Sequence, residues 1–296
     1  MFTKHTTLII PTKDRFNLLS KTILYFFKSK IFFKKIIVVD SSTRNNKIKI
    51  IKLCKKYKIK LLFTKPSTSY QRNYGKKFVK KSKYVMFLDD DIVFYKNAFI
   101  EMNKAIKKYN KATGFCFNII SKKKTLIDYF KKTKLISYLK LYDNQQGIVM
   151  DNGWHTQLLN LDKDIKVEWM YSGATIFKFR EIKKKYFLED NSSYCYLEDL
   201  DFTYSLFRQK KILMGISKAK ILNQNICFRN TFEFGLKEIK NRYFFVRKYN
   251  LNYNLFFLTS FIKLLLNSLE ILKFNFKIIY RLLGNIFGII YLLIIK

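Results

Sequence analysis

The sequence predicts an α/β fold: a mixed, mostly parallel sheet with helices on both of its faces. Two observations predict it. Short apolar runs of strand-forming residues alternate with segments of helical spacing through residue 88, and several of these runs end in polar or acidic residues. Parallel strands present their carboxyl ends at one edge of a sheet, where ligands bind. With 296 residues, of which 49% are hydrophobic, the chain can bury one large core or two modest ones.

The elements follow one another in a regular order. The expected strands are Thr6–Pro11, Lys35–Asp40, Lys60–Thr64, Tyr84–Leu88 and, later, Lys166–Met170. The expected helices of the first part are Leu18–Lys28, Lys47–Tyr57 and Ser69–Lys81. The spacing of the first helix predicts a core face of Leu18, Leu19, Ile23, Phe26 and Phe27. This alternation implies right-handed crossovers between parallel strands.

Three consecutive carboxylates, Asp89, Asp90 and Asp91, follow the apolar run Tyr84–Leu88. Like charges repel one another, so a fold tolerates them best where a cation neutralises them. If the strand continues this far, Asp89 and Asp91 point to one side, which suits two oxygen ligands around one divalent metal. A solvated acidic turn explains the same three residues equally well.

Two further polar clusters are expected at the same edge of the sheet, Thr12-Lys13-Asp14 and Asp40-Ser41-Ser42. Asp40 is placed to accept a hydrogen bond from a nucleobase or ribose hydroxyl, or else to cap the next helix. Arg72 is placed to clamp a phosphate, or else is a solvated surface residue. The sequence contains neither G-x-G-x-x-G nor G-x-x-x-x-G-K-[ST], so a metal is the natural counter-charge for a diphosphate.

The chain is strongly basic, with 58 basic and 21 acidic residues and a formal net charge of +37. Only nine of the basic residues are Arg, the residue that base recognition favours, and Lys is spread over the whole chain. We therefore expect no specific nucleic-acid partner and a secondary attraction to phosphates and acidic lipid. Four scattered cysteines without a C-x-x-C pair favour a reducing compartment, and we expect no signal peptide.

A series of motifs in a fixed order resembles glycosyltransferase family 2, whose members have the Rossmann-like GT-A fold and use nucleotide-diphospho-sugars. In chain order the motifs are LIIPTKDR, IIVVDSS, TSYQRNYG, FLDDDI, WMYSGATIFKFR and YLEDLDFTYSLFRQKK. Each motif is weak alone, and the ordered set from Thr6 to Lys211 is fairly specific. The second acidic residue that usually follows the nucleotide-contacting aspartate is replaced by Ser41-Ser42. No Q-x-x-R-W motif occurs, so the resemblance implies a single addition of sugar.

The resemblance also implies roles for individual residues. Asp199 would be the base that takes the acceptor proton, and Glu198 would orient the acceptor; helix capping is the alternative for these acids. Asp91 and Asp89 would bind a divalent cation, Mn²⁺ or Mg²⁺. The residues implied in donor binding are Pro11, Thr12, Asp14, Arg15, Asp40, Arg72, Asn73, Asp89 and Asp90. Those implied in acceptor binding are Ser172, Gly173 and Glu198, although Gly173 also suits a plain turn.

Residues 1–225 are expected to form the GT-A domain and residues 226–296 a C-terminal helical region. Within it, residues 252–296 are apolar and basic, and their longest uncharged run, Leu282–Ile295, is shorter than the ~20 residues of a spanning helix. Basic amphipathic helices on an anionic membrane fit this pattern, and a buried hairpin or an oligomer contact is the alternative. We expect a cytoplasmic protein at the inner face of the membrane.

The sequence therefore predicts a metal-assisted, inverting, non-processive glycosyltransferase that uses a nucleotide-diphospho-sugar donor and a glycan or lipid-linked acceptor. One alternative is a nucleotidyltransferase of related fold, which usually has a Gly-rich loop after the first strand; Thr12-Lys13-Asp14-Arg15 has no glycine. The other is a non-catalytic basic protein that binds membranes or nucleic acid. It would need no acidic clusters and would bind polyanions with a steep salt dependence.

Overall fold

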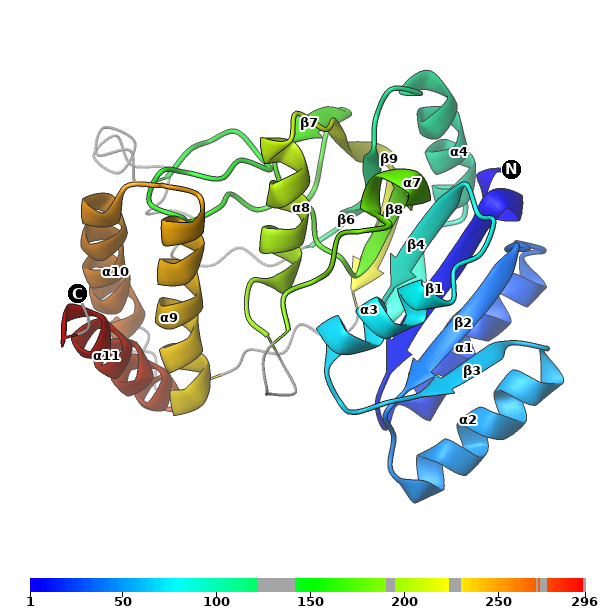
Figure 1. Ribbon diagram of the computed structural model, residues 1–296, viewed down its shortest axis with the longest axis horizontal. Coiled ribbons are helices and arrows are strands. Elements are labelled where there is room, and N and C mark those ends of the chain that lie inside the picture. The colour runs from blue at the N-terminus through cyan, green and yellow to red at the C-terminus, as the bar shows by residue number, and fades with distance from the viewer. Residues whose placement is uncertain (122–141, 190–194, 224–229, 270, 272–275, 295–296) are drawn as a thin grey trace. The chain divides into compact units, whose positions relative to one another are not determined.

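The structure is a computed structural model that describes residues 1–121, 142–189, 195–223, 230–269, 271 and 276–294. Its chain divides into two compact units (Figure 1). The first comprises Met1–Ser121 and Leu158–Asn225, and the second comprises Lys122–Gln157 and Ile226–Lys296. The segment between residues 122 and 157 thus groups with the C-terminal helices, although it lies between two parts of the first unit in sequence.

The first unit is built on a nine-stranded sheet in the order β3-β2-β1-β4-β8-β6-β9-β5, with β7 paired to β9. The strands are β1 Thr6–Thr12, β2 Lys35–Asp40, β3 Lys60–Phe63, β4 Tyr84–Leu88, β5 Ile92–Phe94, β6 Gly114–Ile119, β7 Ile165–Val167, β8 Ala174–Lys178 and β9 Leu213–Asn223. Its helices are η1 Phe2–His5, α1 Phe16–Lys28, α2 Arg44–Lys56, α3 Thr68–Lys77, α4 Ala98–Lys108, α7 Phe179–Ile182 and α8 Glu198–Arg208.

The sheet is parallel where helices connect its strands. Strands β3, β2, β1 and β4 lie side by side and parallel, as their helical crossovers require (Figure 1). β8 is antiparallel to both β4 and β6, whereas β6 and β9 are parallel. The mixed, mostly parallel α/β sheet expected from the sequence is confirmed, and the antiparallel pairs lie beyond β4.

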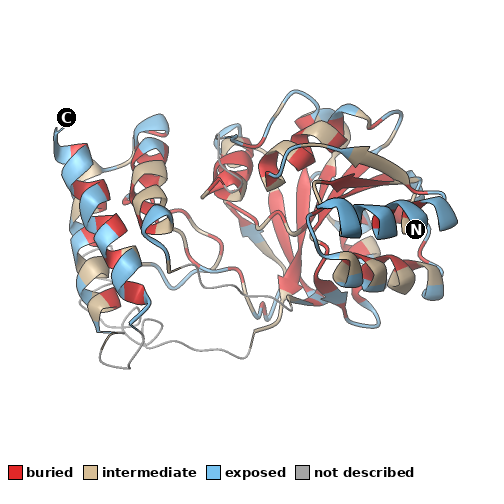
Figure 2. Ribbon diagram, turned by 90° about the horizontal axis from the view of Figure 1, so that it is seen from below, coloured by how far each residue is buried: buried red, intermediate tan, exposed pale blue. Residues whose placement is uncertain are grey.

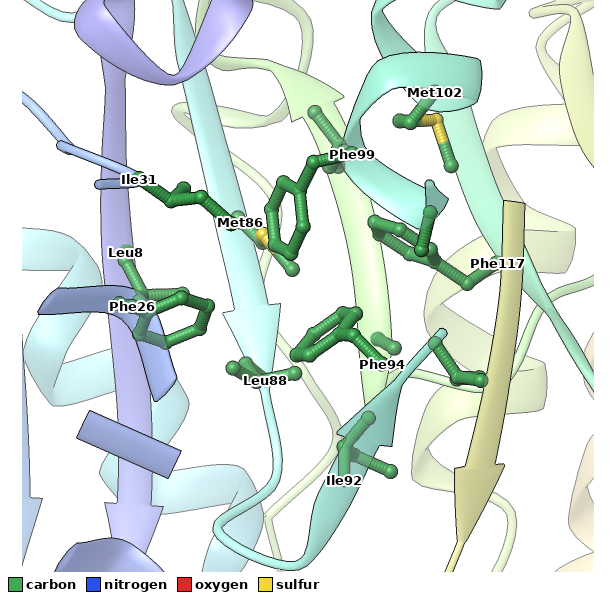
Figure 3. Close-up of a cluster of buried hydrophobic side chains, with 14 of the residues drawn as sticks. Leu8, Phe26, Ile31, Met86, Leu88, Ile92, Phe94, Phe99, Met102 and Phe117 are labelled. Carbon is green, nitrogen blue, oxygen red and sulfur yellow. The ribbon is translucent and has the colours of Figure 1, made fainter. Parts of the chain in front are cut away.

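Helices α1, α2 and α4 cover one face of the sheet. Phe26 of α1 and Phe99 of α4 are buried there against one another and against Phe94 and Phe117. Figure 3 shows these rings around Met86 and Leu88 of β4. Within the predicted core face of α1, Leu19, Ile23 and Phe26 are fully buried, while Leu18 and Phe27 are half-buried.

Helices α3 and α8 lie on the other face. Phe87 of β4 contacts Phe202 of α8 and Phe187 edge to face, and Phe187 stacks on Phe202. Helix α3 approaches the sheet so closely that a Cβ on its Gly75 would lie 2.8 Å from Ile9 Cγ2. The strands are therefore buried between two layers of helices whose outer surfaces are exposed (Figure 2).

The second unit contains α9 Phe232–Lys248, α10 Tyr253–Ser268 and α11 Ile278–Ile294. Its core includes Met150, Trp154, Val246, Phe256 and Leu292. A buried carboxylate, Glu238 of α9, is paired with Lys263 of α10 and Arg281 of α11. These pairs fix the three helices against one another, because separating them would leave Glu238 buried without a counter-charge.

Several expected elements differ from the structure at their ends. Helix α3 ends at Lys77 rather than Lys81, and β7 ends at Val167 rather than Met170. The strand before the three aspartates ends at Leu88, as expected, and does not continue through them. Asp90 and Asp91 lie in a turn before β5. The alternation of side chains along a strand therefore does not determine the directions of the Asp89 and Asp91 side chains. Cys227, one of the four cysteines, lies outside the described residues.

Candidate active site

The ends of four strands bring the polar clusters together. β1 and β2 pair in a register that sets Thr12 beside Asp40. β4 pairs with β8 so that Leu88 is opposite Ala174, and the residues that follow β4 meet those that precede β8. The backbone N–H of Asp89 donates to the Gly173 carbonyl at 2.8 Å. The expected common edge of the sheet is thus present.

Asp90 and Asp91 form the more buried part of the acidic turn, 4% and 6% exposed. Thr12 Oγ1 donates to Asp90 Oδ2 at 2.6 Å, and burial raises the pKa of Asp90 to about 6. Arg15 Nη1 lies 3.3 Å from Asp90 Oδ1 and 3.1 Å from Asp91 Oδ2. The positive charge of the Arg15 guanidinium therefore offsets the repulsion between these two carboxylates.

Arg72 of α3 joins the acidic turn to the first turn of α8. Its Nη2 donates to Asp89 Oδ1 at 2.8 Å and its Nη1 donates to Glu198 Oε1 at 2.6 Å. The other carboxylate oxygen of Glu198 accepts a hydrogen bond from Ser69 Oγ. Burial raises the pKa of Glu198 to about 7 against the lowering effect of Arg72. The guanidinium is buried, so Arg72 is not the solvated surface residue of the alternative interpretation.

The position of Arg72 follows from how α3 is fixed. Ser67 caps the helix by accepting from the Tyr70 N–H, and Gly75 allows the close approach to the sheet. Gln71 Nε2 donates to the carbonyls of Thr12 at 2.9 Å and Val39 at 2.7 Å, where β1 and β2 end. The helix is therefore tied to the same strand ends that carry the polar residues.

Asp199 lies in the first turn of α8, next to Glu198. Its carboxylate is half-buried, and burial raises its pKa, opposed by the nearby Arg72 charge. The hydroxyl of Thr203 donates to the Asp199 carbonyl at 2.7 Å and accepts from the Met170 N–H at 3.0 Å. This bond ties the start of α8 to the segment that leads into Ser172-Gly173.

Ser172 and Gly173 border Asp89 directly. A Cβ on Gly173 would lie 2.6 Å from Asp89 Oδ2, so a side chain there would displace the carboxylate. The Ser172 side chain is buried, and its Oγ has no hydrogen-bond partner among the described residues. A buried hydroxyl without a partner is costly, which makes this position suited to receive a polar ligand.

Asp40 has a similar unsatisfied atom. It is fully buried; its Oδ1 accepts from the Ser42 N–H at 2.9 Å and from Ser42 Oγ at 2.5 Å. Its Oδ2 is buried without a partner in the described part of the chain, and burial raises the pKa of the carboxyl. Asp40 caps no helix by its side chain, because α2 begins later, after Thr43.

Two residues expected to bind the donor, Asp14 and Asn73, have other partners, and a third, Pro11, is buried in a strand. Asp14 Oδ1 accepts from the N–H and the hydroxyl of Thr43 at 2.8 and 2.7 Å, and these bonds lower its pKa. The Asn73 amide bonds the Phe187 backbone and Glu189, away from the aspartates. Pro11 is buried within β1 and has no N–H to donate.

Sequence reasoning did not single out Ser69 and Gln71, which hold Glu198 and the strand ends. Both precede Arg72 in the motif TSYQRNYG. Because residues three apart on a helix are neighbours, Ser69 and Arg72 both reach Glu198. Polar residues at that spacing beside a candidate site residue were the available signal.

The acidic turn offers oxygen atoms of the kind that Mg²⁺ and Mn²⁺ prefer, on Asp89 and Asp91. Within the described ranges, no group of three or more His, Cys, Asp or Glu side chains is placed to hold a metal ion. Two carboxylates are nevertheless the usual protein contribution to a divalent cation that also binds substrate phosphates. The residues present fit such an ion.

Three solved structures share the fold. S. aureus TarS, residues 1–349, aligns at a TM-score of 0.51 with 13% identity over 80% of this chain and 64% of that one. GalNAc-T7 with UDP, GalNAc and Mn²⁺ aligns at 0.51 with 11% identity over 75% and 44%. The mannosyltransferase PcManGT from Pyrobaculum calidifontis with GDP-Man and Mn²⁺ aligns at 0.50 with 12% identity over 80% and 61%.

The chain thus spans less than two thirds of the length of each of these proteins. No curated protein matches it. The model of glycosyl transferase family 2 matches residues 7–213, which contain every residue of the site described above. The match covers more than half of the sequence and includes most of the first unit, whose fold is that of the GT-A structures. The chain therefore belongs to glycosyl transferase family 2.

Proposed function

We propose that the protein is a metal-dependent, inverting glycosyltransferase that moves one sugar from a nucleotide-diphospho-sugar to a hydroxyl of a glycan or lipid-linked acceptor. The observation that carries this proposal is the contact of Arg72 with both Asp89 and Glu198. It joins the acidic turn of the donor half to the carboxylates of the acceptor half. Arg72 thus connects the residues that would hold the donor to those that would hold the acceptor, the two reactants that such a transfer must align.

The donor half consists of the buried polar groups at the ends of β1, β2 and β4. The unsatisfied Oδ2 of Asp40 is suited to accept a hydrogen bond from the base or ribose of a nucleotide. Arg15 and Arg72 supply positive charge near a diphosphate. GalNAc-T7 with UDP and PcManGT with GDP-Man support a nucleotide donor on this fold.

Asp89 and Asp91 would hold the divalent cation, as their oxygen atoms fit it. The bound ion would neutralise charge on the departing diphosphate. Arg15 also contacts Asp91, so Arg15 and the ion would share this carboxylate. Mn²⁺ in two of the solved structures supports a divalent cation here.

Asp199 would act as the general base. As the acceptor oxygen bonds to the anomeric carbon, its proton passes to the Asp199 carboxylate and the bond from that carbon to the diphosphate oxygen breaks. This single displacement inverts the configuration at carbon. The raised pKa of Asp199 strengthens it as a base. The absence of Q-x-x-R-W from the sequence supports one addition per acceptor.

The test begins with a search for the donor, by thermal shift with UDP- and GDP-sugars in the presence of Mn²⁺. For the donor that binds, Asp199→Asn should abolish transfer while the Kd for the nucleotide stays within a few-fold of the wild-type value. Asp162→Asn, at an exposed carboxylate of the same unit, is the control and should change neither. Near wild-type transfer by Asp199→Asn would show that Asp199 is not the base.

A second variant tests the metal. Asp91→Asn should remove the Mn²⁺ dependence of nucleotide binding, measured by calorimetry with and without EDTA. Equal nucleotide affinity of the wild type in both conditions would refute the metal assignment. Release of a nucleoside diphosphate that requires acceptor distinguishes this reaction from nucleotidyl transfer, which would release inorganic pyrophosphate from a nucleoside triphosphate.

A further inference from the structure

Helix α11 exposes an apolar face, which a helix at a protein–water boundary normally does not. Nine of its side chains are both large and exposed, with fractional exposures from 39% to 77%. They are Ile279, Tyr280, Leu283, Ile286, Phe287, Ile290, Tyr291, Leu293 and Ile294. We call these residues the α11 outer face. In Figure 2 the helix that ends at C has exposed, pale blue stretches along its length.

The polar side chains of α11 point the opposite way. Arg281 is bonded through Nε and Nη2 to Glu238 of α9, at 2.9 to 3.0 Å. Asn285 is buried and donates to the Gly235 carbonyl at 2.9 Å and to Glu238 Oε2 at 3.2 Å. Charge and amide thus face the inside of the second unit. This inverted polarity is the arrangement expected for a surface that meets an apolar medium rather than water.

Glycines bring helices α9 and α11 into close contact. A Cβ on Gly284 would lie 2.0 Å from the Phe232 carbonyl oxygen, and one on Gly235 would lie 2.1 Å from the Arg281 carbonyl oxygen. The backbones of α9 and α11 are therefore in contact, and Gly284 and Gly288 form the small-xxx-small spacing typical of helices that pack within lipid. Rotating α11 to bury its outer face would destroy this contact and the Glu238 pairs.

The charges around the face favour an anionic partner. Neither α10 nor α11 contains an acidic residue. Lys277 is exposed where α11 begins, and Lys240 Nζ lies 4.3 Å from the ring centre of the exposed Tyr291. Aromatic rings and lysine stems of this kind are typical of the boundary between lipid tails and headgroups.

The length of α11 decides how it would meet the lipid. Its 17 residues extend about 25 Å at 1.5 Å per residue, less than the ~30 Å hydrocarbon core of a bilayer. Among the described residues, no helix is long and apolar enough to cross a membrane. A helix that cannot span the bilayer and has one apolar face opposite its polar side chains lies in the plane of the interface.

We propose that the α11 outer face docks the protein on an anionic lipid bilayer, with α11 lying parallel to the membrane plane. The occupant is the lipid surface, because the face combines apolar side chains with neighbouring positive charge and belongs to a helix without an acidic residue. The anionic cytoplasmic leaflet would supply such a surface. Vesicle binding is measured without donor or acceptor, so this inference and the proposed reaction can fail separately.

The experiment is flotation of the full chain with vesicles of phosphatidylcholine mixed with phosphatidylglycerol, in parallel with phosphatidylcholine alone. The wild type should float with the mixed vesicles and less well with the neutral ones. Leu283→Glu/Ile290→Glu places two charges one heptad apart on the outer face and should lower the partition coefficient at least about tenfold. Phe32→Glu, at a side chain 55% exposed in the first unit, should float like the wild type.

A probe of depth does not depend on the charged variant folding. Ile290→Trp should be quenched by brominated lipid in the mixed vesicles, whereas Phe32→Trp should not. Wild-type protein that stays unbound with mixed vesicles, or equal flotation of the folded Leu283→Glu/Ile290→Glu variant, would overturn the inference. A vesicle-independent dimer that this variant converts to a monomer would also overturn it, because the face would then belong to a second copy.

Discussion

Replacing Arg72 by Met should cost the first unit about 3 kcal/mol of unfolding free energy. Arg72 is 3% exposed and binds Glu198 Oε1 at 2.6 Å and Asp89 Oδ1 at 2.8 Å. Removing one partner of a buried pair typically costs ~3–5 kcal/mol, because the other charge is left buried. The Asp89 side chain is 33% exposed and partly screened, and Glu198 can escape by binding a proton, so the lower end of that range applies.

The cost should depend on pH with a defined sign. The pKa of Glu198 is raised by burial from its ordinary 4.5 to about 7, so in the wild type its contribution to stability is lost as pH rises from 4.5 through about 7. Without the Arg72 charge the pKa rises further, and the loss continues above pH 7. The difference in unfolding free energy between wild type and Arg72→Met should therefore grow between pH 6 and pH 8.

Urea unfolding with EDTA and without donor measures this difference. Arg180→Met is the matched control, because Arg180 is 82% exposed beside Glu181 and its loss should cost no more than ~1 kcal/mol. Arg72→Met/Glu198→Gln should recover part of the stability lost by the single variant, since no charge is then left buried. The reasoning fails if Arg72→Met is as stable as Arg180→Met at pH 8.

Three other outcomes follow from the buried contacts. Gly284→Val should loosen α11 by more than ~2 kcal/mol, seen as earlier proteolysis of the C-terminal helices, because its Cβ would strike the Phe232 carbonyl. Acid should destabilise the second unit, because basic neighbours lower the pKa of Glu238 and the contribution of this carboxylate to stability is lost as the pH falls below 4.5. Trp fluorescence during an acid titration would report the unfolding. Cys54 and Cys116, whose pKa burial raises to about 12, should react with a thiol reagent at pH 8 only after urea is added.

The strands were the most predictable part of the fold. The strands Lys35–Asp40 and Tyr84–Leu88 have the bounds that their apolar runs predict. A short run of strand-forming residues between polar residues leaves little choice of where the strand begins and ends. The alternation of strands and helices predicted the common edge on which Asp40 and Asp89 lie. The sequence left open whether the chain stays extended through Asp89, Asp90 and Asp91 or turns there, and the structure has a turn at Asp90 and Asp91.

The side-chain contacts within the site could not be predicted from the sequence, for a different reason. Arg72 and Glu198 are 126 residues apart, and Ser69 and Glu198 are 129 apart. A single sequence carries no signal for such pairs, because their meeting depends on how α3 and α8 pack on the same face of the sheet. The family motifs placed both segments near the site, and only the packing showed that they share one ion pair.

Helix α11 shows most clearly why composition alone does not predict which side chains of a helix are exposed. The run Leu282–Ile295 favours a membrane contact, with a buried hairpin or an oligomer contact as the alternative, because all of these need apolar residues. The orientation of α11 is decided by the few residues that are not large and apolar. Arg281 and Asn285 form hydrogen bonds with Glu238, and Gly284 packs against the backbone of α9. Once these bonds are made, Leu282, Ile289 and Leu292 are buried in the second unit and the other large side chains of α11 are exposed, apart from Ile278. The polar minority of the helix thus determines where its apolar majority is exposed, and with it the face available to lipid.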